Sequence, residues 1–103
     1  MNSLFQSRVK AVKERLDPIE FYEKQLDCCN ISQHYCKGWR QAGLCPFHND
    51  TKEGSFYINQ NSGAFKCFSC GAKGGDIISF LQKRDALRFN EALRLLENEG
   101  GIR

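Results

Sequence analysis

Two short pairs of potential metal ligands constrain this sequence more than any other feature. Cys45 and His48 are separated by two residues, Cys67 and Cys70 have the same spacing, and 18 residues lie between the pairs. A tetrahedral cation such as zinc binds four thiolate or imidazole donors. Two turns that each present a pair, joined by a hairpin, supply that arrangement. The sequence therefore predicts one structural Zn²⁺ ion held by Cys45, His48, Cys67 and Cys70.

Size and composition fit a small metal-stabilised domain. A chain of 103 residues forms one small domain, for which a metal is a common supplement to the hydrophobic core. The N-terminal region has no long apolar run, so we expect neither a signal peptide nor a membrane span. We therefore expect a cytoplasmic protein, in which six cysteines favour metal ligands and thiols over disulfides. The net charge of +3 does not by itself indicate a nucleic-acid partner.

A further group of cysteine and histidine residues precedes the first ligand pair. It consists of Cys28, Cys29, His34 and Cys36. These residues could form a second metal site, but no two of them are separated by two residues as in the main motif. Reduced thiols and a surface histidine are the favoured interpretation, and their role stays open.

The first third of the chain predicts two helices followed by strands. Apolar residues recur at helical spacing over residues 3–16, which indicates an amphipathic helix. Asp17-Pro18 supplies an N-cap and a first helical residue, so a second helix is expected over residues 17–26. Alternating residues at 29–34 predict a strand, and residues 39–44 predict the strand that leads to Cys45.

The region between and after the ligand pairs predicts a hairpin and two more helices. Strands are expected at 55–59 and 64–67 around a turn at 60–63, with Lys66 and Phe68 facing away from Phe65 and Cys67. Asp76 is expected to cap a helix over 76–83, and a last helix should span 88–98. The expected fold class is α+β, a zinc ribbon with a small antiparallel β-sheet, zinc at one end and short flanking α-helices.

Several kinds of chemistry are excluded by the residues. A catalytic zinc keeps a position open for water, whereas four ligands here fill the coordination sphere. Zinc deaminases need a His-x-Glu element, which is missing from the sequence. The Gly-rich segment 71–76 lacks the spacing and the Lys-Ser/Thr end of a P-loop. Carboxylates for a magnesium-dependent polymerase are scattered, so we expect no enzyme activity from this chain alone.

Five segments together resemble the N-terminal zinc-binding domain of bacterial DnaG-type DNA primases. They are GLCPFH (43–48), SF (55–56), FKCFSCGAKGGD (65–76), IISFL (77–81) and FNEALRLL (89–96). The resemblance implies a primase-type zinc-binding domain at 17–99, with a tail or the start of a linker at 100–103. Residues 1–16 before it are the N-terminal amphipathic helix expected from the apolar spacing. The resemblance also implies that a separate catalytic domain, a nucleotidyltransferase, joins the nucleotides.

The sequence departs from the pattern of this family at three places. The segment Thr51–Gly54 is one residue longer than the Lys-Thr-Pro that usually precedes Ser-Phe, and Lys52 is the nearest stand-in for its basic residue. Lys66 stands where His or another polar residue is common, and Arg88 stands where a small residue commonly caps the last helix. These differences favour the hypothesis of a plasmid, phage or other mobile-element relative.

The resemblance further implies binding of single-stranded DNA template and selection of primer start sites in replication. Aromatic side chains stack on bases, and basic side chains follow the backbone. The expected DNA-binding residues are Lys66, Phe68, Trp39, Arg40, Lys37, Tyr57, Lys52 and Lys73. Phe47, Phe56 and Phe65 are expected in the core instead. Further partners implied by the family are a primase catalytic domain and a replicative helicase.

An interpretation from a different class is a stand-alone zinc-ribbon module that binds another protein. The helices expected at 76–83 and 88–98 could expose an apolar groove for a primase, helicase or polymerase partner. Against this, four short helices around a ribbon need their apolar faces to bury a core. The sequence leaves open the oligomeric state, the template preference, and whether the chain is a fragment of a longer primase.

Overall fold

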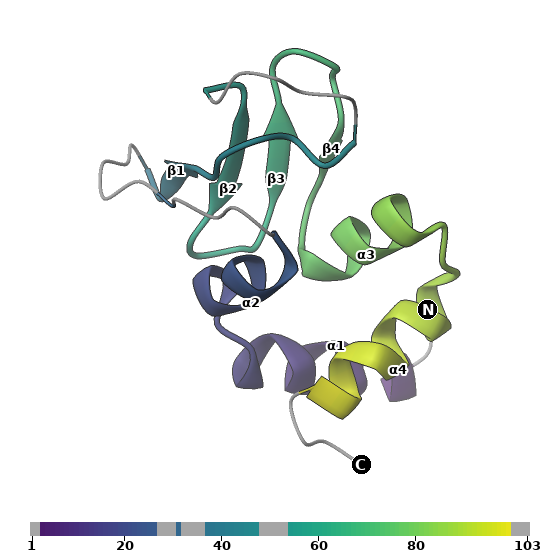
Figure 1. Cartoon of the computed structure of the whole chain (residues 1–103). Coiled ribbons are helices and arrows are strands. Elements are labelled where there is room, and N and C mark those ends of the chain that lie inside the picture. The colour runs from purple at the N-terminus through teal and green to yellow at the C-terminus, as the bar shows by residue number, and fades with distance from the viewer. Residues whose placement is uncertain (1–2, 27–30, 32–36, 48–53, 100–103) are drawn as a thin grey trace.

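The protein is a four-stranded antiparallel sheet with helices gathered at one end. The computed structural model describes residues 3–26, 31, 37–47 and 54–99, with the sheet order β1-β2-β3-β4 (Figure 1). The elements are α1 (Ser3–Arg15), α2 (Pro18–Gln25), β1 (Trp39–Gln41), β2 (Phe56–Asn59), β3 (Phe65–Cys67), β4 (Lys73–Gly74), α3 (Ile77–Asp85) and α4 (Phe89–Glu99). The predicted α+β class with a small antiparallel sheet is confirmed. Within these residues, no helix combines the length and apolar character needed to cross a membrane.

The predicted helices and the central hairpin are confirmed, whereas the edges of the sheet differ. β1 ends at Gln41, earlier than predicted, and Ala42 instead forms a single bridge with Ile31. The strand predicted at 29–34 otherwise lies outside the described residues. β4 was not predicted, because its two residues, Lys73 and Gly74, carry no alternation pattern. It forms because the turn after β3 reverses the chain and aligns these residues beside β3.

Alternation along β2 and β3 separates the two faces of the sheet, as predicted. Phe56, Ile58 and Phe65 are each at most 1% exposed and point into the core. Tyr57 pairs directly with Lys66 on the other face, since residues opposite each other in an antiparallel pair share a side. The hairpin therefore presents a buried apolar face and an outward face that is polar and aromatic.

Phe80 of α3 joins the helices to the sheet. Its ring makes edge-to-face contacts with Phe21, Tyr22 and Phe65, with centroid distances of 5.9, 4.9 and 5.5 Å. The Tyr22 hydroxyl, which is buried, donates a hydrogen bond of 2.7 Å to the Gly63 carbonyl in the β2–β3 turn. The helices are thus fixed to the turn end of the sheet.

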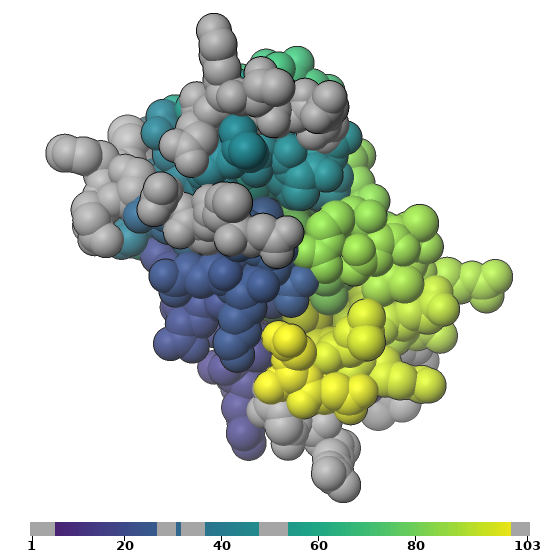
Figure 2. Space-filling model, viewed as in Figure 1, coloured from purple at the N-terminus to yellow at the C-terminus, as the bar shows by residue number. Residues whose placement is uncertain are grey.

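The N-terminal helix packs against the last helix. The Arg8 guanidinium donates two hydrogen bonds, 2.9 and 2.7 Å long, to the Glu97 carboxylate, and Val12 of α1 belongs to the buried core. The space-filling view shows the helical part and the sheet part in continuous contact (Figure 2). The proposed boundary between segments 1–16 and 17–99 stays a prediction.

Asp76, the residue predicted to cap α3, also forms an ion pair with α1. Its carboxylate accepts a hydrogen bond of 2.8 Å from the Ser79 N–H and lies 3.1 Å from the Lys13 ammonium of α1. Burial raises the pKa of Asp76, but the Ser79 and Lys13 interactions outweigh burial and lower it below the usual 3.8. Ionised Asp76 therefore stabilises the folded protein above pH 3.8, the usual pKa of the group, and this stabilisation is lost as the pH falls through the lower pKa of the folded state.

We expect Asp76→Ala to reduce the free energy of unfolding at pH 7 by about 2 kcal/mol, the upper range for loss of a cap. Asp17 provides a matched control, because it caps α2 through the equivalent bond to the Glu20 N–H and is exposed. Asp17→Ala should cost about 1 kcal/mol. Urea unfolding at pH 7 measures both values, and equal losses would show that the Lys13 interaction adds nothing.

Candidate metal centre and nucleic-acid interface

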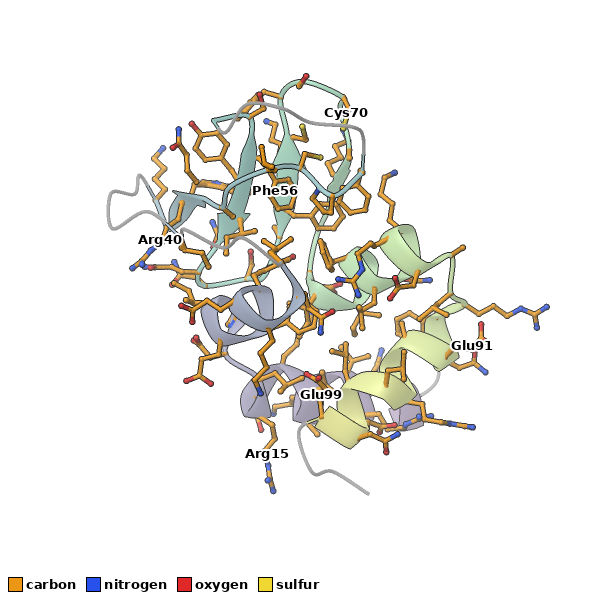
Figure 3. The ribbon with its side chains drawn as sticks, viewed as in Figure 1. Arg15, Arg40, Phe56, Cys70, Glu91 and Glu99 are labelled. Carbon is orange, nitrogen blue, oxygen red and sulfur yellow. The ribbon has the colours of Figure 1, made fainter. Side chains whose placement is uncertain are left out.

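Three cysteine thiols from separate parts of the chain gather at the end of the sheet remote from the helices. Cys45 follows β1 and Cys67 ends β3. Cys70 lies in the turn before β4 and is labelled in Figure 3. Their Sγ atoms all lie within 4.8 Å of one another, and those of Cys45 and Cys70 are 3.8 Å apart. Two sulfurs bound at about 2.3 Å to a tetrahedral ion lie about 3.8 Å apart. The spacing of the sulfurs therefore fits a shared zinc ion.

Backbone hydrogen bonds shape both turns around the sulfurs. The Phe47 N–H points to Cys45 Sγ at 3.4 Å, and the Cys70 N–H points to Cys67 Sγ at 3.5 Å. Such N–H donors favour a thiolate over a thiol. Gly71 has a positive φ of 80° and donates its N–H to the Cys67 carbonyl at 3.0 Å. A residue with a Cβ would be strained there, which explains the glycine after the second pair.

The surroundings of Cys45 disfavour its thiolate unless a cation lies nearby. Burial, followed by the neighbouring Cys67 and Cys70 sulfurs, raises the pKa of the Cys45 thiol to about 12. Metal ligands must be deprotonated, and a bound divalent cation stabilises the thiolate that burial disfavours. Three crowded thiols are thus a donor set that suits Zn²⁺.

Some of the cysteine and histidine residues singled out in the sequence lie outside the described part of the chain. His48, the predicted fourth ligand, lies outside the described residues, and its role stays a prediction. The same holds for Cys28, Cys29, His34 and Cys36, the group considered for a second metal site. Among the described residues, the cysteines near the sheet end form the one cluster of three or more ligand-type side chains.

An open groove on the outward face of the sheet contains most of the side chains predicted to contact DNA. We call it the aromatic groove, and its volume is about 450 Å³. Its lining residues are Lys37, Trp39, Tyr57, Lys66 and Phe68. Phe68 is 65% exposed, and its ring lies edge-on to Tyr57 at a centroid distance of 5.4 Å. The Lys66 ammonium lies 4.7 Å from the centre of the same ring.

The other three residues predicted to contact DNA differ in where they lie relative to the aromatic groove. Lys73 pairs directly with Lys66 across β3 and β4, so it lies beside the aromatic groove. Arg40 pairs with Ile58 and therefore lies on the core side of β1, away from Lys66. Lys52 is outside the described residues. Alternation within Trp39-Arg40-Gln41 is the sequence signal that separates Arg40 from the groove.

Gln41 is a polar residue of this face that the sequence interpretation missed. Its Nε2 donates a hydrogen bond of 3.1 Å to the Tyr57 hydroxyl, and the two residues are opposite each other in the β1–β2 register. Alternation with Trp39 could have placed Gln41 on the outward face. Its partner could not be predicted, because the register between β1 and β2 depends on a long connection.

A short antiparallel ribbon whose turns bring three thiols together defines a zinc-finger class of domain. The CHC2 zinc finger matches residues 6–103, and the chain belongs to this family, the zinc-binding domain of DnaG-type DNA primases. The resemblance noted in the sequence is therefore confirmed.

Similar proteins agree with this assignment. The chain is 34% identical over 94 residues to a DNA primase of Thermotoga maritima, covering 91% of this chain and 15% of the relative. It is 46% identical over 94 residues to a DNA primase of Streptomyces coelicolor, covering 91% of this chain and 14% of the relative.

A solved structure also agrees. The crystal structure of the zinc-binding and RNA polymerase domains of Aquifex aeolicus primase aligns with a TM-score of 0.71 and 26% identity. The alignment covers 100% of this chain and 23% of that one. The 103 residues thus correspond to the zinc-binding domain, and the catalytic domain of the relatives lies outside them, as predicted.

Proposed function

We propose that this domain binds single-stranded DNA template in the aromatic groove and so helps a primase to select where primers begin. The observation that carries the proposal is the clustering of Trp39, Tyr57 and Phe68 with Lys37 and Lys66 on one exposed face. The names of its relatives, which are DNA primases, support the same function.

The exposure of Phe68 is the first argument for a stacking surface. A phenylalanine that is 65% exposed contributes little to the core. Phe68 also lines one groove together with Trp39 and Tyr57, and a contiguous apolar surface of this kind marks an interaction site, which a single exposed apolar residue does not. Unpaired bases stack on such rings with little dependence on sequence. Lys66, 4.7 Å from the ring centre, adds positive charge beside the same surface. Together these two residues suit a base and its neighbouring phosphate.

The pairing of two lysines is the second argument. Lys66 and Lys73 occupy directly opposed positions on β3 and β4. Like charges at such positions destabilise a sheet, so their presence favours an anionic ligand that neutralises them. A phosphate of the DNA backbone supplies that charge, with Lys37 at another part of the groove.

The metal centre would support this surface without taking part in chemistry. Phe68 follows Cys67 and precedes Cys70, so the proposed ligands fix the turn that carries the stacking ring. With Cys45, His48, Cys67 and Cys70 all bound, a single structural Zn²⁺ ion has no position left for a reactive water. We therefore propose a scaffolding role for the metal.

Two substitutions test the groove. Phe68→Ala should weaken binding of a short single-stranded oligonucleotide by about 5-fold or more, since stacking contributes roughly 1–3 kcal/mol per base. Lys66→Ala should weaken binding and flatten its salt dependence by about one phosphate contact. Fluorescence anisotropy titrations at two salt concentrations measure both effects.

The control is Lys10→Ala, which removes the same charge from α1. The Lys10 side chain is 77% exposed and lies 4.0 Å from Glu14 on the helix, away from the aromatic groove. Its affinity and salt dependence should stay close to those of the unmodified protein. Unchanged affinity and salt dependence in Lys66→Ala would contradict the proposed binding face.

A second candidate function, docking on a protein partner, is favoured by one observation. Leu95 of α4 is 47% exposed and lines a hollow of about 360 Å³ with Leu87, Asn90, Glu91, Arg94 and Asn98. The partner we would assign is a primase catalytic domain, because the Aquifex structure joins such a domain to its zinc-binding domain. Failure of the protein to bind any oligonucleotide in the titration above would favour this function.

A further inference from the structure

The hydrogen bond between Gln41 and Tyr57 lies at the edge of the aromatic groove. The Gln41 Nε2 and the Tyr57 hydroxyl are 3.1 Å apart, and the bond is exposed to solvent. Tyr57 also touches the ring of Phe68, with a centroid distance of 5.4 Å. Tyr57 therefore connects the proposed stacking ring to a side-chain amide.

Stability does not account for this arrangement. An exposed hydrogen bond replaces bonds to water and adds little to the free energy of unfolding. It does restrict the Gln41 side chain, which otherwise has several rotatable bonds. A primary amide has two N–H groups and one carbonyl, so the bond to Tyr57 uses only part of its capacity. The amide is thus positioned with donor and acceptor capacity beside the groove.

We propose that Gln41, positioned by Tyr57, reads the hydrogen-bonding edge of one template base that stacks on Phe68. This inference rests on the proposed binding of single-stranded DNA. Phosphate contacts and stacking hold a strand without identifying its sequence, whereas contacts to base edges identify it. Gln41 is therefore the specificity-determining residue of the groove, and Tyr57 is a positioning residue.

Adenine is the base that best matches a glutamine amide. Glutamine forms a bidentate pair with the adenine amino group and N7. In a single strand the Watson–Crick edge is also open, and there the same amino group lies beside N1. Adenine hence offers an acceptor next to an amino donor on either edge, and its large ring suits stacking.

The test uses short oligonucleotides that differ in one central base, with the affinity for each measured by fluorescence anisotropy. The unmodified protein should prefer adenine by about 5-fold or more, the range of one bidentate contact. Gln41→Leu should reduce that preference to about 2-fold or less while retaining most of the affinity, because stacking remains. Tyr57→Phe keeps the ring and removes the hydroxyl, so it should lower the preference in the same way.

Controls separate base reading from structural damage. Gln6→Leu changes an exposed glutamine of α1 and should leave the preference intact. Thermal unfolding of Gln41→Leu should match that of the unmodified protein.

An unmodified protein without a preference for adenine, or a Gln41→Leu variant with the full preference, would overturn the inference while leaving DNA binding in place. Absence of binding to every oligonucleotide would instead overturn the proposed function, and the inference with it.

Discussion

Removal of the metal with a chelator is expected to unfold the sheet. The strands contain only 3, 4, 3 and 2 residues, at or below the short end of the usual range, so the sheet has few hydrogen bonds of its own. A metal bound by the cysteine cluster would tie together the ends of the sheet farthest from the helices. Removal of the metal leaves the strands in that half joined only by their backbone hydrogen bonds. Structural zinc in small fingers contributes roughly 10–16 kcal/mol, comparable with the whole stability of roughly 5–15 kcal/mol of a typical domain.

Circular dichroism before and after chelation measures this effect. The near-ultraviolet signal from the aromatic core should collapse, the far-ultraviolet strand contribution should fall, and added Zn²⁺ should restore both. Cys67→Ser should reproduce the loss, whereas Ser69→Ala, an exposed position in the same turn, should not. Elemental analysis confirms that the ion has gone. A metal-free protein with unchanged spectra would show that the cluster is not a structural centre.

Among substitutions that leave the cysteine cluster intact, Phe80→Ala is expected to have the largest effect on stability. Phe80 is 0% exposed and contacts aromatic rings from α2, the loop after β1, and β3; these are Phe21, Tyr22, Phe47 and Phe65. Truncation leaves a cavity where the helices meet the sheet. The expected loss is about 3–5 kcal/mol, a large share of the stability of a domain this small.

Phe68→Ala provides the matched control, because the same ring is removed from an exposed position. Phe68 is 65% exposed, so its truncation should change the free energy of unfolding by no more than about 0.5 kcal/mol. Urea unfolding of the two zinc-loaded variants measures the difference. Similar losses would mean that Phe68 belongs to the core, which would also weaken the case for a stacking surface.

The sequence predicted those parts of the fold that depend on local chemistry. Asp17-Pro18 and Asp76 identified the starts of two helices because capping depends on neighbours a few residues away. Alternation along 64–68 correctly separated Phe65 and Cys67 from Lys66, since each strand residue faces opposite its neighbour. The ligand spacing also predicted that Cys45, Cys67 and Cys70 lie close together, and the structure places their thiols side by side.

Features that depend on distant pairing were not predictable. β4 is too short to show a pattern, and its existence depends on the turn after Cys67. β1 ends at Gln41, and the next residue, Ala42, donates its N–H to the Phe56 carbonyl and forms a bridge with Ile31, a pairing that no local signal encodes. Arg40 was grouped with the DNA-binding residues as a basic neighbour of Trp39, whereas its place in the register puts it on the opposite face. Gln41 was overlooked because its partner Tyr57 is distant in sequence.

The β2–β3 hairpin is restrained at both of its ends, which has a consequence for the alignment of its strands. Tyr22 holds the turn through Gly63, and Cys67 joins the thiol cluster at the other end. A slip of one residue between these strands would turn Lys66 inward and expose Phe65. Because neither restraint involves an outward-facing side chain, that face can acquire substitutions without loss of strand alignment. Related domains could thus diversify their ligand-facing residues while keeping one sheet.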